Sequence, residues 1–241
     1  MFFDTDNACV PYLSDHYIDS MCNDMIRRFD ESVFTSPHPV NIELFIKKAL
    51  HLNIRYARLS ADSSILGVNV FRETDRMPVY SEKSRRAEYV HADEGDIFIE
   101  NELTLLGRSG RLRFTLAHEA GHALWHRMYF IARSNSLRRI ASIGCGHEDI
   151  GVCPERETLG RMSREELIEY QANKTASCLL MPRDAVNALF KDRPAPETRD
   201  DICDMILLTA GTFRVSDVAA RYRLMDLGLI SRDCFQSKKA V

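Results

Sequence analysis

An apolar stretch in the middle of the chain, residues 114–125 (FTLAHEAGHALW), sets the strictest condition on the fold. Its only charged residue is Glu119. A helix on the surface of a globular protein has a polar face, so this composition predicts a helix that is buried in the interior. Two imidazoles and a carboxylate cost several kcal/mol when they are buried without partners. His118, Glu119 and His122 therefore require a ligand that satisfies them, and a divalent metal ion is such a ligand.

These three residues have the spacing of an HExxH motif. His118 and His122 are four residues apart, about one helical turn, so both imidazoles point from one face toward a common ion. Glu119 lies beside them, where it can accept a proton from water at the metal. The alternative is a chance motif, expected in on the order of one chain in a hundred of this length, with histidines held by backbone groups. A third ligand decides between the two interpretations.

A third histidine close behind the motif is excluded. A metzincin has a glycine three residues and a histidine six residues after the second histidine, whereas this chain has Trp125 and Met128 there. A glutamate from a second helix is the other common solution.

The best candidate for that second helix begins at Ser163 and ends before Pro182. Ser163 and Glu166 have the pattern of a capping box, and a helix rarely continues into a proline. Glu169 shares a helix face with residues that are small or apolar, namely Ala172, Ala176 and Leu179. The spacing therefore turns Glu169 inward, as a third metal ligand or, alternatively, as a salt-bridge partner.

Small residues on both predicted helices favour the metal ligand. Ala172 and Ala176 would let the second helix approach Ala117 and Gly121 of the first, which brings a glutamate side chain within reach of the metal. The two neighbouring acids are excluded, because Glu166 is used by the cap and Glu165 points elsewhere. The predicted ligands are thus His118, His122 and Glu169.

The order of predicted elements is helices, sheet, helices, which defines an α+β fold. Apolar spacing predicts helices over residues 14–34 and 41–52, and strand patterns cover residues 65–71, 87–90 and 96–100. We expect the strands to form a small antiparallel sheet, followed by helices from Gly110 onward. The expected division is an N-terminal helical extension (1–36), a core with a zincin-like HExxH helix (37–182) and a C-terminal helical segment packed on it (183–241).

Composition and charge limit the binding partners and the cellular location to be expected. The formal charge of −3 over 241 residues provides no general attraction to nucleic acid, so direct nucleic-acid binding is not expected. No apolar run approaches the roughly 20 residues that span a bilayer, and the first residues do not have the pattern of a signal peptide. The seven cysteines show no paired CxxC spacing, which excludes a zinc ribbon and a disulfide framework. These features predict a cytoplasmic protein with reduced thiols; they do not indicate an oligomeric state.

Three further features each have a functional and a structural interpretation. His126, one turn beyond His122, is either a group that supports the metal ligands or a core histidine. Cys145, His147 and Cys153 match no standard metal site, so we expect no second metal. Residues 213–224 (FRVSDVAARYRL) resemble the second helix of a helix-turn-helix, but the net charge of this end of the chain is near zero, and packing on the core is the better interpretation.

Two segments together identify a family resemblance. Residues 113–122 (RFTLAHEAGH) and residues 169–182 (EYQANKTASCLLMP) resemble the ImmA/IrrE family of metallopeptidases. Carried over by position, the resemblance implies His118, His122 and Glu169 as zinc ligands and Glu119 as the catalytic base. It also implies cleavage of an intracellular protein, a transcriptional repressor of helix-turn-helix type. Ala120 and Thr175 differ from the usual family pattern.

The sequence thus predicts a zinc-dependent metallopeptidase. In this interpretation Glu119 takes a proton from water polarised by the metal and returns it to the leaving amine. An extended substrate is expected to add to an edge of the sheet near Ile97–Ile99. The alternative is a regulatory module that keeps the metal for structure and acts by contacting a repressor or toxin; retention of Glu119 argues against it, because a structural site gains nothing from a base.

Overall fold

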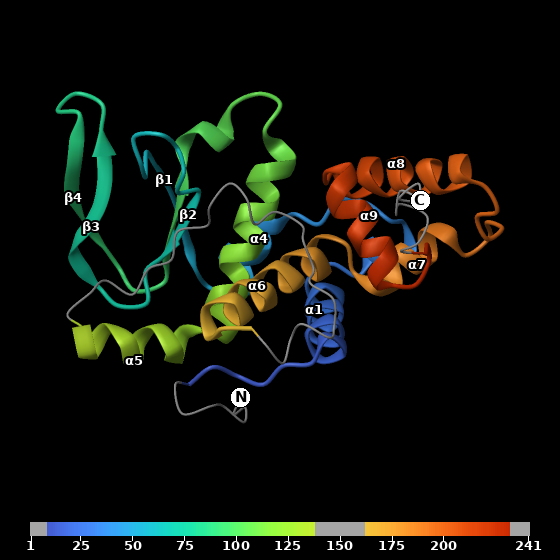
Figure 1. Ribbon diagram of the computed structural model, residues 1–241, viewed down its shortest axis with the longest axis horizontal. Coiled ribbons are helices and arrows are strands. Elements are labelled where there is room, and N and C mark those ends of the chain that lie inside the picture. The colour runs from blue at the N-terminus through green and yellow to red at the C-terminus, as the bar shows by residue number, and fades with distance from the viewer. Residues whose placement is uncertain (1–8, 138–161, 232–241) are drawn as a thin grey trace, which may run out of the picture.

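The computed structural model describes residues 9–137 and 162–231 (Figure 1). In chain order the elements are α1 (Asp15–Phe29), α2 (Ser32–Thr35), α3 (Ile42–Lys48), β1 (Asn53–Ala57), β2 (Gly67–Asn69), β3 (Thr74–Ser81), β4 (Arg86–Ala92), β5 (Asp96–Glu100), the 3-10 turn η1 (Asn101–Thr104), α4 (Ser109–Trp125), α5 (Arg127–Leu137), α6 (Arg164–Leu180), α7 (Arg183–Phe190), α8 (Arg199–Phe213) and α9 (Asp217–Asp226). The α+β class is as predicted. Cys145, His147 and Cys153 lie outside the described residues.

Strand β5 is the centre of a three-stranded sheet. β1 pairs with it in parallel, Ile54 opposite Ile97, and β2 pairs with it in the antiparallel sense, Val68 opposite Phe98. β3 and β4 form a separate antiparallel hairpin at one end of the molecule (Figure 1). The sheet therefore differs from the expected antiparallel one, because β1 and β5 are joined by a long connection that runs through β2, β3 and β4 and lets them run parallel.

The position of β5 corrects one expectation. Ile97–Ile99 do not lie at an edge of the sheet, because β5 has a partner on both sides. All five residues of β5 are buried, which is typical of a central strand rather than an edge strand. Among the described residues, β2 is the edge that lies next to α4.

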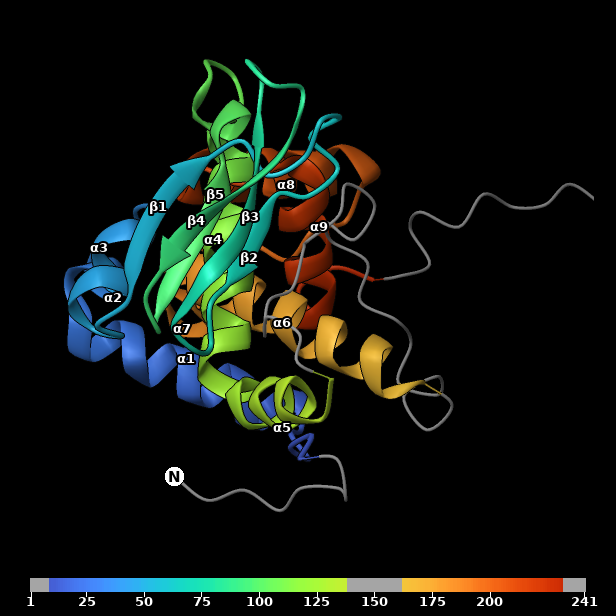
Figure 2. The same ribbon diagram turned by 90° about the vertical axis from the view of Figure 1, so that its left-hand side faces the viewer.

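Helix α4 packs against the three-stranded sheet and against α6: it stands beside the sheet in Figure 1 and behind the strands in Figure 2. Every residue from Phe114 to His122 is buried, so the prediction of an interior helix is confirmed. α4 and α6 approach closely at Gly121. A Cβ atom there would lie 3.0 Å from the Cα of Ala172 and 3.1 Å from the Cβ of Thr175, so any side chain would push the helices apart. The small residues on the two helices thus allow the close approach that the sequence predicts.

Helices α1 and α9 complete the surroundings of α6. α1 packs along α6 with Ile18, Cys22 and Ile26 fully buried, and these side chains share one hydrophobic core with residues from α4, α6 and the C-terminal helices. The predicted helix over residues 14–34 ends at Asp30, which leaves the helical region, and a short second helix follows. The four described cysteines, Cys9, Cys22, Cys178 and Cys203, are free. No described helix has the length and apolar character needed to cross a membrane.

Candidate metal centre

Helices α4 and α6 bring the three predicted ligands together. His118 and His122 project from successive turns of α4, and Glu169 projects from α6. One ligand atom of each lies within 4.8 Å of those of the others, and in the described residues no other group of three His, Cys, Asp or Glu side chains does this. His118 and His122 are completely buried, while the side chain of Glu169 is 31% exposed. The cluster therefore has two interior ligands and one open side.

The atoms that face one another are those a metal ion would use. His118 Nε2 lies 2.9 Å from His122 Nε2 and 3.3 Å from Glu169 Oε2. His122 Nε2 lies 3.6 Å from Glu169 Oε1. Two imidazole nitrogens and one carboxylate are the ligand set of a catalytic zinc site such as that of thermolysin. The donor set fits such an ion.

The opposite nitrogen of each histidine is engaged elsewhere. His118 Nδ1 lies 2.8 Å from the side-chain oxygen of Asn173 on α6. Because an amide oxygen only accepts, Nδ1 carries the proton and Nε2 presents its lone pair to the cluster. His122 Nδ1 lies 3.0 Å from His126 Nδ1. Partners of this kind fix the ring orientation of metal-binding histidines.

Glu119 lies on the side of the cluster that faces β2. The side-chain amide of Asn69 donates both to the backbone oxygen of Glu119 and to its Oε2. Oε1 is buried and has no hydrogen-bond partner among the described residues. Burial raises the pKa of this carboxyl to about 8, and the negative charge of Glu169 adds to the shift, while His118 and Asn69 oppose it. A buried carboxylate oxygen with an unused lone pair suits a proton acceptor for water at the metal.

Gly67 leaves the space that Glu119 occupies. A Cβ atom on Gly67 would lie 2.3 Å from Glu119 Oε1 and 2.7 Å from its Cγ, which is far inside contact distance. Residues 67 and 69 of a strand point to the same face of the sheet, so Gly67 and Asn69 both lie against the Glu119 carboxylate. Neither residue was singled out by the sequence, because nothing in a three-residue strand indicates which helix it will face.

The titrating groups of the cluster are shifted in the directions a cation site needs. Burial lowers the pKa of His122 to about 4, so the neutral imidazole that binds metals is the stable form at neutral pH. The pKa of Glu169 lies well below its ordinary value; burial alone would raise it, but the adjacent His118 and His122 rings outweigh burial. At neutral pH the cluster therefore contains the Glu169 carboxylate beside a neutral His122 imidazole.

The two neighbouring acids of α6 are occupied, as predicted. Glu166 accepts from the backbone N–H of Ser163 at 2.7 Å and completes the capping box. Glu165 accepts from the hydroxyl of Tyr129 at 2.8 Å, away from the histidines. Asn173 escaped prediction, although its position one turn after Glu169 on the same face is a usable signal.

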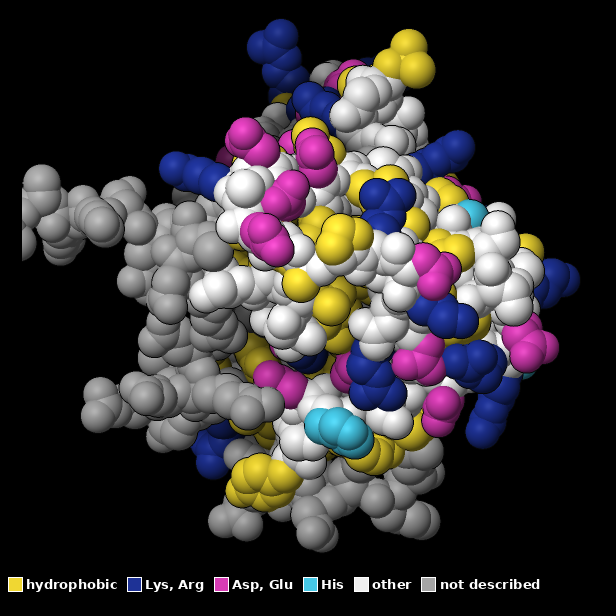
Figure 3. Space-filling view, turned by 90° about the vertical axis from the view of Figure 1, so that its right-hand side faces the viewer, with side chains coloured by type: hydrophobic (Ala, Val, Ile, Leu, Met, Phe, Trp, Pro, Cys, Tyr) yellow, Lys and Arg dark blue, Asp and Glu magenta, His cyan; other side chains and the backbone are white. Residues whose placement is uncertain are grey.

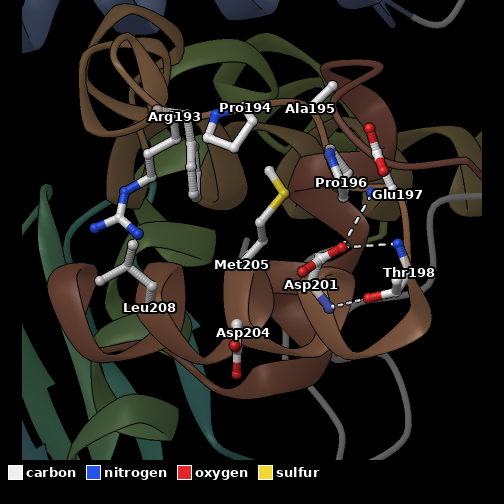
Figure 4. Close-up of a pocket in the computed structure, with 11 residues that line it drawn as sticks. Arg193, Pro194, Ala195, Pro196, Glu197, Thr198, Asp201, Asp204, Met205 and Leu208 are labelled. Atoms are coloured by element: carbon white, nitrogen blue, oxygen red, sulfur yellow. Dashed lines mark hydrogen bonds between the residues drawn. The ribbon is translucent and has the colours of Figure 1, made fainter.

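The larger of two described cavities lies away from this cluster. It has a volume of about 460 Å³ and is formed between α7 and α8 by Pro194, Met205 and Leu208, with Glu197 and Asp201 at its rim (Figure 4). On the face of the molecule that the C-terminal helices form, acidic side chains gather beside hydrophobic ones (Figure 3). The cavity has no histidine or cysteine in its lining. Asp201 is already used by the capping box of α8, so we assign no chemistry to this cavity.

The smaller cavity adjoins the cluster. It has a volume of about 330 Å³, and its wall includes Asn69, which holds Glu119, and Ala123, one turn beyond Glu119 on α4. The remainder combines apolar residues such as Leu52 and Phe71 with the polar side chains of His51, Glu94 and Arg127. His118, Glu119, His122 and Glu169 are not among the residues that line it, and Asn69 is its link to the cluster.

A buried HExxH helix, an acidic side chain from a second helix and a mixed sheet beside them define the class of metallopeptidase-like domains. The family model for the IrrE N-terminal-like domain, Peptidase_M78, matches residues 65–225, and the chain belongs to this family. Its members are classed as peptidases, so proteins are the class of substrate that the family indicates. No curated protein matches the chain.

Proposed function

We propose that this protein is a zinc-dependent metallopeptidase in which His118, His122 and Glu169 hold the ion. The observation that carries the proposal is the convergence of these three side chains beside a buried glutamate whose Oε1 has no partner among the described residues. When bound, zinc would polarise water and the peptide carbonyl. Zinc rather than another divalent ion is inferred from the two nitrogen ligands and one carboxylate.

Glu119 is the proposed catalytic base. Asn69 keeps its Oε2 in place by hydrogen bonding, and Oε1 is left to accept the proton of the attacking water and to deliver it to the leaving amine. The raised pKa of the buried carboxyl makes the return of the proton easier than it would be from an exposed glutamate. A metal cation nearby would lower the pKa of Glu119, which favours the carboxylate that accepts the proton from water. Burial raises the pKa, which favours the later return of that proton, so Glu119 can act first as base and then as acid.

Strand β2 is the proposed docking edge for an extended substrate. Leu66 and Val70 bond to β5 through their backbone groups, so the alternating residues Gly67 and Asn69 direct theirs away from β5. A peptide strand that pairs there would lie next to Glu119. Backbone pairing orients a scissile bond without requiring a particular side chain, and the smaller cavity could then select among side chains.

The proposed substrate is an intracellular protein, and the family suggests a transcriptional repressor of helix-turn-helix type. This also implies a cytoplasmic location, which agrees with the free cysteines among the described residues. We do not expect direct binding of nucleic acid. The second candidate is a regulatory module that binds the repressor, or a toxin, without cutting it; the unpartnered Glu119 Oε1 favours the peptidase.

Co-expression with candidate repressors tests the proposal. Wild type should produce one discrete cut, detected by mass spectrometry, and Glu119→Gln should abolish it because an amide does not accept the proton of the water. The variant should stay folded and bind metal as wild type does, since Glu119 is not a proposed ligand. A repressor that is bound but left intact by wild type would favour the regulatory module; cleavage by Glu119→Gln at the wild-type rate would eliminate Glu119 as the base.

A further inference from the structure

A chain of hydrogen bonds leads from the metal centre to the N-terminal segment. His122 Nδ1 faces His126 Nδ1 at 3.0 Å, and His126 Nε2 faces the side-chain oxygen of Gln171 on α6 at 2.8 Å. The amide nitrogen of Gln171 donates to the backbone oxygen of Pro11 at 3.0 Å. His126 and Gln171 are both almost fully buried, so water does not compete for these groups.

The Pro11 carbonyl fixes the direction of every bond in this chain, because a carbonyl only accepts. Gln171 must turn its NH₂ group toward Pro11 and its oxygen toward His126. His126 must then carry its proton on Nε2, which leaves a lone pair on Nδ1. His122 must in turn donate from Nδ1, and its Nε2 presents a lone pair toward Glu169. This is the tautomer that binds a metal through Nε2.

We infer that Gln171 is a positioning residue of the metal centre and that the Pro11 carbonyl, outside the family-matched residues 65–225, sets its orientation. The inference rests on the proposed metal ligands. Pro11 is held by its surroundings: Val10 is buried against Tyr129 and Ile168, and Asp15 accepts from the hydroxyl of Tyr170 at 2.6 Å. The N-terminal segment therefore supports the metal centre without touching the metal.

Zinc affinity of metal-free protein, measured by competition with a chromogenic chelator, tests this inference. Gln171→Met keeps the length of the side chain but removes the acceptor, and it should weaken zinc binding about 10- to 100-fold. Gln171→Glu keeps an acceptor for His126 Nε2 but sets a buried carboxylate oxygen against the Pro11 carbonyl, so it should lower stability while keeping zinc affinity closer to that of wild type than Gln171→Met does. The matched control is Thr175→Val, one turn further along α6: it removes the hydroxyl that accepts from Trp125 and donates to the backbone oxygen of Gln171, but it leaves the Gln171 side chain in place, so it should lower stability and leave zinc affinity unchanged.

A double variant separates this role from general destabilisation. Gln171 acts through His126, so Gln171→Met should add little to the loss caused by His126→Phe. Absorption spectra of the cobalt-substituted proteins should change in Gln171→Met and not in Thr175→Val. Wild-type zinc affinity in Gln171→Met, or fully additive losses, would overturn the inference while leaving the metal centre standing. Failure of wild type to bind zinc would overturn the proposed metal centre and the inference with it.

Discussion

Glu119 can occupy its position because Gly67 has no side chain. Replacing Gly67 by alanine adds a single carbon atom and tests this. A Cβ atom would lie 2.3 Å from Glu119 Oε1, and the carboxylate would have to move. Misplacement of a catalytic group by about 1 Å costs on the order of 100-fold in rate, so we expect Gly67→Ala to lose cleavage to about that extent. Zinc content should be unchanged, because the three proposed ligands lie on other elements.

Gly211→Ala on α8 is the matched control for this substitution. Nothing lies within 4 Å of a Cβ at position 211, and alanine is favoured over glycine inside a helix by roughly 0.5–1 kcal/mol. Cleavage should therefore be unchanged and stability slightly raised. Equal activity in Gly67→Ala and Gly211→Ala would show that the position of Glu119 is unimportant.

The three proposed ligands make a second prediction at the residue scale. His122→Ala and Glu169→Ala should each lose most of their zinc, because a site with two protein ligands is incomplete. Elemental analysis of protein purified without chelator, with circular dichroism to verify folding, measures this. Glu165→Ala removes a nearby acid that bonds Tyr129 instead, so it should keep about one zinc per chain as wild type does. Full zinc occupancy in the folded ligand variants would contradict the assignment.

Helix α6 was predictable at both ends because its signals are local. Ser163 and Glu166 form the expected capping box, and the helix ends before Pro182. β1 and β3 were not predicted. No residue of β1 is buried and only one residue of β3 is, so neither has the continuous buried pattern of β5. Their pairing depends on partners distant in the chain, which local patterns do not record.

The capping box provides the prediction at the scale of an element. Ser163→Ala removes the side-chain acceptor for the backbone N–H of Glu166 and should lower the free energy of unfolding by about 1 kcal/mol. Chemical denaturation measures the change. Ser36→Ala, at an exposed serine beyond α2, should stay within about 0.5 kcal/mol of wild type. Equal stability of the two variants would mean that this end of α6 is held by tertiary contacts instead.

At the scale of the whole molecule, a buried cluster of charged side chains links helix α1 to helix α9. Arg223 of α9 is fully buried; it donates to Asp19 of α1, to Asp226, and to the backbone oxygen of Met181. Burial alone would raise the pKa of Asp19, but Arg223 outweighs it and the pKa is lowered. Asp19 therefore stabilises the folded state above its unfolded pKa of about 4, and this stabilisation is lost as pH falls through the lower folded pKa.

Asp19→Ala leaves a buried guanidinium short of a partner and should cost about 3 kcal/mol at neutral pH, measured by thermal unfolding. The loss relative to wild type should shrink at low pH, where Asp19 is protonated in both states. Asp204→Ala, at an exposed acid of α8, is the control and should change stability by less than about 0.5 kcal/mol. A pH-independent difference between wild type and Asp19→Ala would contradict this view of the cluster.

The proposed metal ligands could be chosen from the sequence, whereas the residues that hold them in place could not. His118, Glu119 and His122 lie within one motif, and Glu169 follows from helix spacing and small residues. Asn69 meets Glu119 across 50 residues of sequence, and Gln171 meets Pro11 across 160. Such contacts arise only when the sheet, α1 and α6 are assembled, so no single segment contains their signal.

The position of α1 has a consequence for anyone who wishes to isolate the family-matched part of this protein. Ile18, Cys22 and Ile26 are fully buried against the core that α6 shares, yet they precede the family-matched residues 65–225. A fragment that begins at residue 65 would expose apolar surface at about 25 cal/mol per Å², in addition to losing Asp19 from beneath Arg223. The family-matched residues thus lack part of the hydrophobic core that they share with α1, and a fragment that keeps the whole of that core has to begin ahead of α1.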